Sequence, residues 1–167
     1  HACQDPLEGT RVPGVRRVLL PTDFSEATES AAQWAKWIAG QFQAELVLLH
    51  VLEEDGWTLK ALSEAGGNQG EDPFQARGRL IRAELERWRE RFGAHRIELR
   101  PGLPHEVIPE VCREFGVDLV CIGTHGRSGI QRVFFGSVAE HVVRVSPVPV
   151  LTVRPQTPPR LRRILVA

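Results

Sequence analysis

Three glycines and a serine stand at a spacing that suits phosphate binding. Gly123 is followed after two residues by Gly126. Nine further residues lead to Gly136 and then to Ser137. Glycine lets a ligand approach the backbone closely, and the first N–H groups of a helix carry partial positive charge. Because an apolar run at 117–122 predicts a buried strand just before this segment, the combination indicates a phosphate-binding strand, loop and helix start.

The helix start itself is signalled by Ser137 and, three residues later, Glu140. This spacing is typical of a capping box, so we expect Ser137 to cap a helix that runs to about Val145. Taken alone, Gly123 and Gly136 would indicate simple turns. Their combination with the strand and the cap is what makes nucleotide binding the leading hypothesis.

Strand and helix patterns alternate along the chain. Apolar spacing and caps predict helices that begin after Ser25 and at Pro73, Pro104 and Ser137, although Pro109 should kink or shorten the third of them. Aliphatic runs predict strands at 17–21, 46–51, 97–99, 117–122 and 148–153. This alternation predicts an α/β fold: a five-stranded parallel sheet, in the order 3-2-1-4-5, with helices on both faces.

In such a sheet, ligands bind at the carboxyl ends of the strands where the winding reverses, here between the first and fourth strands. Pro21, Thr22 and Asp23 follow the first strand, and residues 123–126 follow the fourth. We expect these two segments to face each other across one crevice. Asp23 is equally suited to contact a ligand or only to cap the next helix, and both interpretations remain open.

Composition excludes several classes of function. The formal net charge is zero, so no overall basic field favours nucleic acid or an anionic membrane. Apolar runs are too short to span a bilayer, and we expect a cytoplasmic protein. Neither a P-loop signature nor G-x-G-x-x-G follows the first strand, which argues against a P-loop NTPase or a dinucleotide oxidoreductase. Cys3, Cys112 and Cys121 lack metal-ligand spacing, and the last two are expected to be inert core residues.

Three segments are expected along the chain. Residues 1–15 lack periodicity and predict a loose N-terminal arm, and residues 16–154 predict one domain. Residues 155–167 begin with a proline-rich linker, and their end echoes residues 15–21. That echo indicates either the first strand of a second repeat or a coincidence, because short basic-then-aliphatic strings are common. A chain trimmed after Arg154 without loss of stability would favour the second-repeat interpretation.

From about Arg16 to Arg154 the chain resembles the universal stress protein family, specifically its ATP-binding branch. That branch is marked by G-x2-G-x9-G-[S/T], which the three glycines and Ser137 meet. Segments that agree with the family stand in the right order at 19–25, 48–51, 102–106 and 148–153. The resemblance implies a Rossmann-like sheet of the adenine nucleotide α hydrolase type.

The resemblance also implies where an adenine nucleotide would bind. The base and ribose would lie near Pro21, Asp23 and Val51, with the Val51 backbone at the base edge and Gly123 against the ribose. The phosphates would lie within residues 126–129 and at the helix start. His125 invites a catalytic interpretation, but no nucleophile is spaced to pair with it, so a structural or ligand-lining role is favoured. The complete implied set is Pro21, Thr22, Asp23, Val51, Gly123, Thr124, His125, Gly126, Arg127, Ser128, Gly129, Gly136, Ser137, Val138 and Ala139.

The function implied is an ATP-binding regulatory or stress-response module that acts as a nucleotide-dependent sensor. ATP would bring Mg²⁺ through its phosphates, and a second copy or a tandem domain would pair through the strand Val148–Val153. A slow Mg²⁺-dependent ATP hydrolase in the same pocket is one alternative, although no general base stands at a sensible spacing. A dimerising scaffold without nucleotide is another, and the intact glycine motif argues against it.

A valine side chain at Gly126 would fill the space that the phosphates need. We therefore expect Gly126→Val to abolish ATP binding in a calorimetric titration while leaving the thermal unfolding curve intact. Unchanged affinity in this variant would refute the proposed phosphate position.

Overall fold

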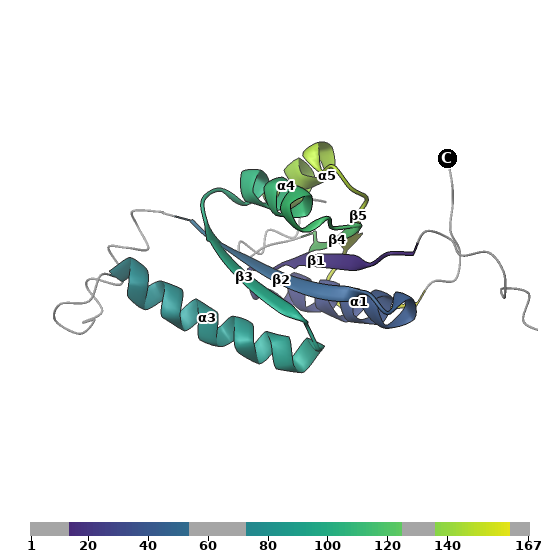
Figure 1. Ribbon diagram of the computed structural model, residues 1–167, viewed down its shortest axis with the longest axis horizontal. Helices are drawn as coiled ribbons and strands as arrows, with labels where there is room; N and C mark the ends of the chain where they lie inside the picture. Colours follow the sequence, from purple (N-terminus) through teal and green to yellow (C-terminus); the bar gives the residue numbers. More distant parts are fainter. Residues whose placement is uncertain (1–13, 54–72, 125–135, 161–167) are drawn as a thin grey trace, which may run out of the picture.

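The computed structural model describes residues 14–53, 73–124 and 136–160 of the 167-residue chain. Within these ranges, five strands form one sheet in the order β3-β2-β1-β4-β5, and every neighbouring pair is parallel (Figure 1). The predicted sheet and its strand order are confirmed. The strands are β1 (Arg17–Pro21), β2 (Glu45–Leu52), β3 (Arg96–Pro101), β4 (Leu119–Gly123) and β5 (Val150–Val153).

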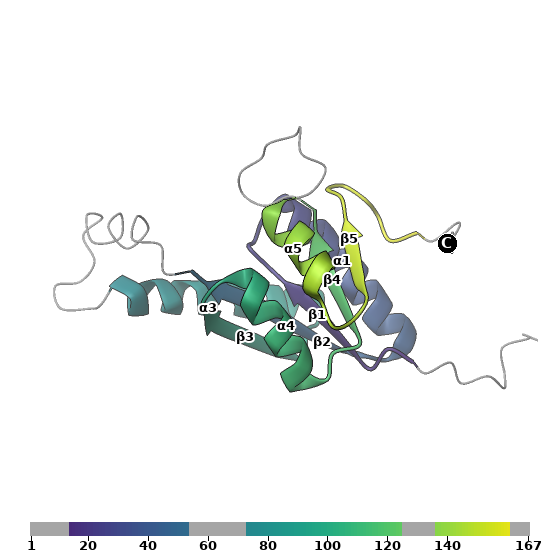
Figure 2. The ribbon, with the colours of Figure 1, turned by 90° about the horizontal axis from the view of Figure 1, so that it is seen from above.

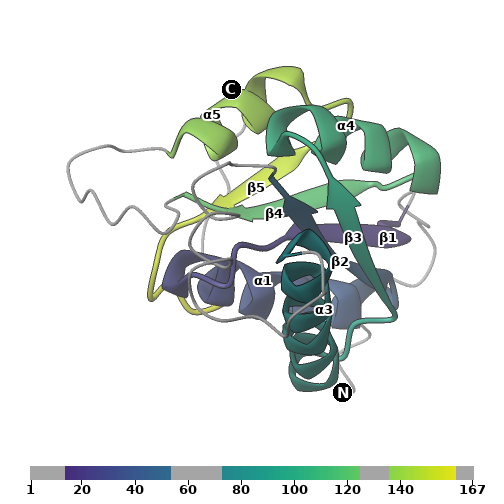
Figure 3. The ribbon, with the colours of Figure 1, turned by 90° about the vertical axis from the view of Figure 1, so that its left-hand side faces the viewer.

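Helices cover both faces of the sheet, as expected. On one face lie α1 (Glu26–Phe42) and α3 (Pro73–Phe92), and on the other lie α4 (Pro104–Phe115) and α5 (Ser137–Val145) (Figure 3). Alternate strand residues feed the two cores: Val18 and Leu20 pack on the α1 side, whereas Leu19 packs on the α4 side. Burial on both faces explains why the central strands are almost continuously aliphatic.

The helix ends follow the capping signals in most places. Ser25 caps α1, its hydroxyl accepting from the Thr28 N–H, and Gly116 ends α4 with a φ of +59°. Phe42, the last residue of α1, is 50% exposed. The expectation that Pro109 shortens its helix was wrong. α4 continues from Pro104 to Phe115, and Pro109 itself is buried in the core-facing side, so packing outweighs one lost helical hydrogen bond.

Two cysteines lie in the core, as predicted. Burial raises the pKa of the Cys112 thiol to about 11 and that of the Cys121 thiol to about 12. Thiolate is therefore scarce at neutral pH, and neither side chain is a good nucleophile. Among the helices that the structure describes, none is long and apolar enough to cross a membrane.

Figure 2 shows the segment after β5 in yellow, and two of its residues are hydrogen bonded to α1. We call residues 154–160 the C-terminal strap. The Gln156 N–H donates to Ser30 Oγ at 2.8 Å, and Trp34 Nε1 donates to the Thr157 carbonyl at 2.9 Å. Ser30 and Trp34 are both buried. Residues expected to form a linker thus complete the hydrogen bonding of two buried side chains.

Removal of the strap should therefore destabilise the domain. A chain that ends at Arg154 loses both hydrogen bonds, each worth roughly 0.5–1.5 kcal/mol, and exposes Trp34 to water. We expect its free energy of unfolding to fall by about 1–3 kcal/mol in urea titrations. The matched control is a chain that ends at Arg160, which keeps the strap. Equal stability of the two shortened chains would show that the strap contributes nothing.

Candidate functional site

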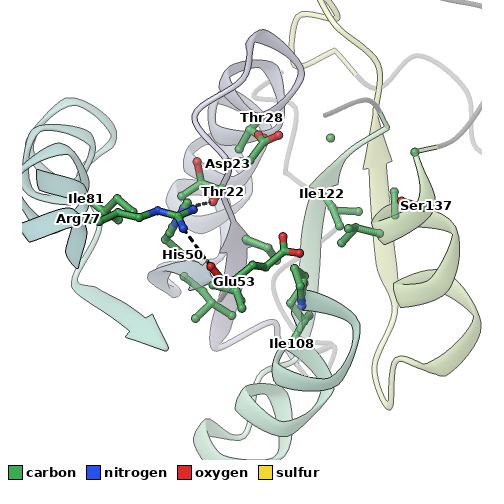
Figure 4. Close-up of a pocket in the computed structure, with 18 of the residues that line it drawn as sticks. Thr22, Asp23, Thr28, His50, Glu53, Arg77, Ile81, Ile108, Ile122 and Ser137 are labelled. Atoms are coloured by element: carbon green, nitrogen blue, oxygen red, sulfur yellow. Dashed lines mark hydrogen bonds between the residues drawn. The ribbon is translucent and has the colours of Figure 1, made fainter. Parts of the chain in front are cut away.

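A cavity of about 520 Å³ lies at the carboxyl ends of β1, β2 and β4. Figure 4 shows it between α3 on one side and the start of α5 on the other. Its volume falls within the usual range for small-molecule pockets, and it occupies the switch point between β1 and β4 that the sequence indicated. Its walls comprise Pro21, Thr22, Asp23, Thr28, Leu49, His50, Val51, Glu53, Arg77, Leu80, Ile81, Pro104, Ile108, Ile122, Gly123, Gly136, Ser137, Val138 and Ala139.

The turn between β1 and α1 is held rigidly beside this cavity. The Thr22 N–H donates to the Leu49 carbonyl at 2.8 Å, and His50 Nδ1 lies 2.7 Å from the Thr22 carbonyl. Since a carbonyl only accepts, Nδ1 carries the proton in this contact. Phe24 adopts a φ of +61°, and its ring stacks on His50 with centroids 5.0 Å apart. The buried His50 is therefore satisfied, as expected of a near-core histidine.

Asp23 organises the same turn from its side chain. Its Oδ1 accepts from the Ser25 N–H at 3.0 Å and from Thr28 Oγ1 at 2.6 Å. Asp23 also lines the cavity. The helix-start role is thus observed, and ligand contact by the same carboxylate stays a prediction.

Gly123 ends β4 directly against the first turn of α1. A Cβ at this position would lie 2.8 Å from the Ala27 carbonyl carbon and 2.9 Å from its oxygen. Real Cβ atoms do not approach backbone so closely. The resemblance implied that a missing side chain admits the ribose. The structure gives a different physical reason: glycine is needed so that α1 can pack on the strand end.

The two ends of the glycine-bearing loop meet. The Thr124 N–H donates to the Val153 carbonyl at 2.9 Å, and the Gly136 N–H donates to the Thr124 carbonyl at 2.6 Å. These bonds bring Gly123 and Gly136 to one side of the cavity. Thr124 itself is buried and does not line it, unlike the other predicted site residues that the structure describes. The remaining ones, residues 125–129, lie outside the described residues.

The prediction that Ser137 caps this helix was wrong. Gly136 is the N-cap of α5, and its carbonyl accepts from the Glu140 N–H at 2.9 Å. The Glu140 carboxylate pairs instead with Arg144 at 3.1 Å, one turn along the helix. Ser137 is therefore the first helical residue and lines the cavity with Val138. The first N–H groups of α5, which have no partner within the helix, lie at the cavity wall.

Several lining residues were not found from the sequence. Glu53 follows β2, Arg77 and Ile81 come from α3, and Pro104 and Ile108 come from α4. Helical spacing places Ile81 and Ile108 on apolar helix faces, but spacing alone does not show that one end of each face borders a cavity. Within the parts of the chain described, no group of three or more histidine, cysteine, aspartate or glutamate side chains could hold a metal ion.

The strand order and the helices on both faces define a doubly wound α/β protein with a cavity at its switch point. A family model described as the universal stress protein family matches residues 14–154, and the chain belongs to that family. The universal stress protein MJ0577 of Methanocaldococcus jannaschii is 31% identical over 156 residues, which cover 83% of this chain and 94% of the relative.

Solved structures agree with this assignment. A structure of MJ0577 superimposes with a TM-score of 0.67 at 29% identity, covering 86% of this chain and 98% of that one. A universal stress protein in complex with cAMP superimposes with a TM-score of 0.56 at 28% identity, covering 86% of this chain and 99% of that one. The second of these relatives binds a cyclic adenine nucleotide.

The contact between Gly123 and α1 predicts a stability effect without a ligand. Gly123→Ala must push the α1 backbone away, and such overpacking typically costs about 1–3 kcal/mol. We expect that loss in the free energy of unfolding of the nucleotide-free protein. Gly40→Ala is the matched control, because nothing lies within 4 Å of its Cβ position and alanine favours a helix. If Gly123→Ala were as stable as Gly40→Ala, packing against α1 would not require glycine at position 123.

Proposed function

We propose that this protein is an ATP-binding regulatory module that changes its interactions with its nucleotide state. One observation carries the proposal: the start of α5, the strand end at Gly123 and the β1–α1 turn border a single cavity. A helix N-terminus is suited to phosphate, and the strand ends offer backbone groups and a carboxylate for a base and sugar. The relative that binds cAMP supports an adenine nucleotide as the ligand class.

The orientation follows from the polarity of the cavity. The phosphates would lie at the N-terminus of α5, near the Ser137 hydroxyl and the amides of Val138 and Ala139. The base would extend along the ends of β1 and β2, toward Asp23 and Val51. Mg²⁺ would arrive on the phosphates, and residues 126–129 would enclose them.

Sensing is favoured over rapid hydrolysis by the state of the ionisable groups. Asp23 Oδ1 and His50 Nδ1 are both engaged in holding the β1–α1 turn. His50 Nδ1 carries a proton and Asp23 Oδ1 already accepts two hydrogen bonds, so neither of these two atoms is available to take a proton from an attacking water. Slow hydrolysis on a metal-bearing nucleotide remains the alternative outcome of the binding experiment.

Pairing of two domains through β5 is part of the proposal. β5 ends the sheet on one side, and Val143 and Val145 on the preceding helix expose apolar side chains. An aliphatic edge strand is a ready template for another strand. A homodimer or a tandem-domain pair would cover this edge, and analytical ultracentrifugation with and without ATP would test the pairing.

Two variants at the first residue of α5 test the phosphate position. Proline is tolerated at the first helical position, and the extended Gly136 before it suits a proline, so Ser137→Pro should keep the helix. It removes both an N–H and a hydroxyl, whereas Ser137→Ala removes only the hydroxyl. We expect calorimetry to show ATP affinity falling roughly 10-fold for Ser137→Ala and further for Ser137→Pro, since hydrogen bonds to charged groups are worth about 1.5–3 kcal/mol.

Adenosine is the control ligand, because it carries no phosphate and its affinity should be equal in all three proteins. Chromatography of the bound nucleotide then separates the alternatives: intact ATP supports the sensor, and ADP supports the slow hydrolase. Wild-type protein that binds no nucleotide would contradict both.

A further inference from the structure

The cavity has a wall on α3 that carries an arginine and that the glycine motif does not include. α3 packs over β2 and β3, whereas α5 lies beside β5, so the two helices border the cavity from opposite sides of β1. Figure 4 shows Arg77 and Ser137 on these two sides. Arg77, Leu80 and Ile81 form the part of α3 that lines the cavity. A ligand with its phosphates at α5 therefore presents its other end to α3.

Arg77 is fixed in place at this end. Its Nη1 donates to the Glu53 backbone carbonyl at 3.0 Å, which ties α3 to the residue that follows β2. The side chain is half-buried, and the adjacent Leu80 is 63% exposed at the rim. A planar guanidinium beside aliphatic side chains suits an aromatic ring, because arginine combines a fork of N–H donors with a flat face.

The neighbouring charges indicate what Arg77 contacts. Asp23 and Glu53 line the same end of the cavity, and their carboxylates disfavour a phosphate there. Carboxylates accept from an amino group, and a guanidinium donates to ring nitrogens. The edge of adenine offers that combination, an exocyclic amine donor beside a ring-nitrogen acceptor.

We infer that Arg77 is a base-recognition residue, which donates from its guanidinium to a ring nitrogen of the purine while the phosphates occupy the far end of the cavity. This inference rests on the proposed nucleotide site. If it is correct, a residue of α3 contacts the base directly and affects which ligand binds.

The test separates the two ends of the ligand. In the full chain, Arg77→Ala is compared with wild type for binding of adenosine, which has no phosphate, of tripolyphosphate, which has no base, and of ATP. We expect affinity for adenosine and for ATP to fall by the same factor, roughly 10- to 100-fold. Affinity for tripolyphosphate should not change.

Arg82→Ala removes one charge from an exposed position on the same helix, and it should bind all three ligands as wild type does. Arg77→Lys keeps a donor for the Glu53 carbonyl and so protects the fold, but it lacks the planar fork and should bind adenosine with intermediate affinity. Circular dichroism melting curves establish that each variant is folded.

Unchanged adenosine affinity in folded Arg77→Ala, or in Arg77→Lys if the alanine variant unfolds, would overturn the inference and leave the nucleotide site in place. Weakened tripolyphosphate binding would show that Arg77 contacts phosphate instead. Wild-type protein that binds neither ATP nor adenosine would refute the proposed function, and the inference with it.

Discussion

The close contact between the end of β4 and the first turn of α1 is the constraint on which the site depends. At Gly123 the Ala27 backbone occupies the place where any other residue would carry its Cβ. This contact lets α1 begin beside the strand end. The β1–α1 turn, with Asp23 and Thr28 hydrogen bonded to each other, is thereby placed next to the α5 N-terminus. The cavity exists because α1 and α5, which lie on opposite faces of the sheet, both start at the carboxyl ends of the strands.

The cavity is chemically asymmetric, and its asymmetry follows from the strand order. The α5 side offers the partial positive charge of a helix N-terminus, which is suited to phosphate. The β2 side offers two carboxylates and one guanidinium, which together suit a base with both donors and acceptors. An adenine nucleotide has its charge at one end and its hydrogen-bonding base at the other. The charges of the described walls are therefore the basis for the proposed ligand and for its proposed orientation.

α1 links the site to the stability of the domain. Its first turn borders the cavity, and its middle, through Ser30 and Trp34, holds the C-terminal strap. On its other side it faces α3, where Arg91 pairs with Glu29. One helix therefore contacts the cavity, the C-terminal strap and α3.

Most of the fold could be predicted from the sequence, because it depends on local patterns. Aliphatic runs and helical spacing are properties of neighbouring residues, so the elements, the parallel sheet and the capping by Ser25 could be predicted. Two expectations failed for different reasons. Pro109 stays inside a helix because tertiary packing buries it, a contact that local patterns do not show. Glu140 pairs with Arg144 one turn along the same helix, so here one local interaction replaces another.

The candidate site also has a part that the sequence predicts and a part that only the structure shows. The glycine spacing and the segment Pro21–Asp23 are local signals, and from them the sequence by itself determined the family, the sheet and one side of the cavity. Only the tertiary structure decided that Gly123 serves helix packing, that residues 154–160 cover α1, and that Arg77 closes the cavity from α3. These facts depend on which elements meet in space, and such contacts join residues that are far apart in the chain.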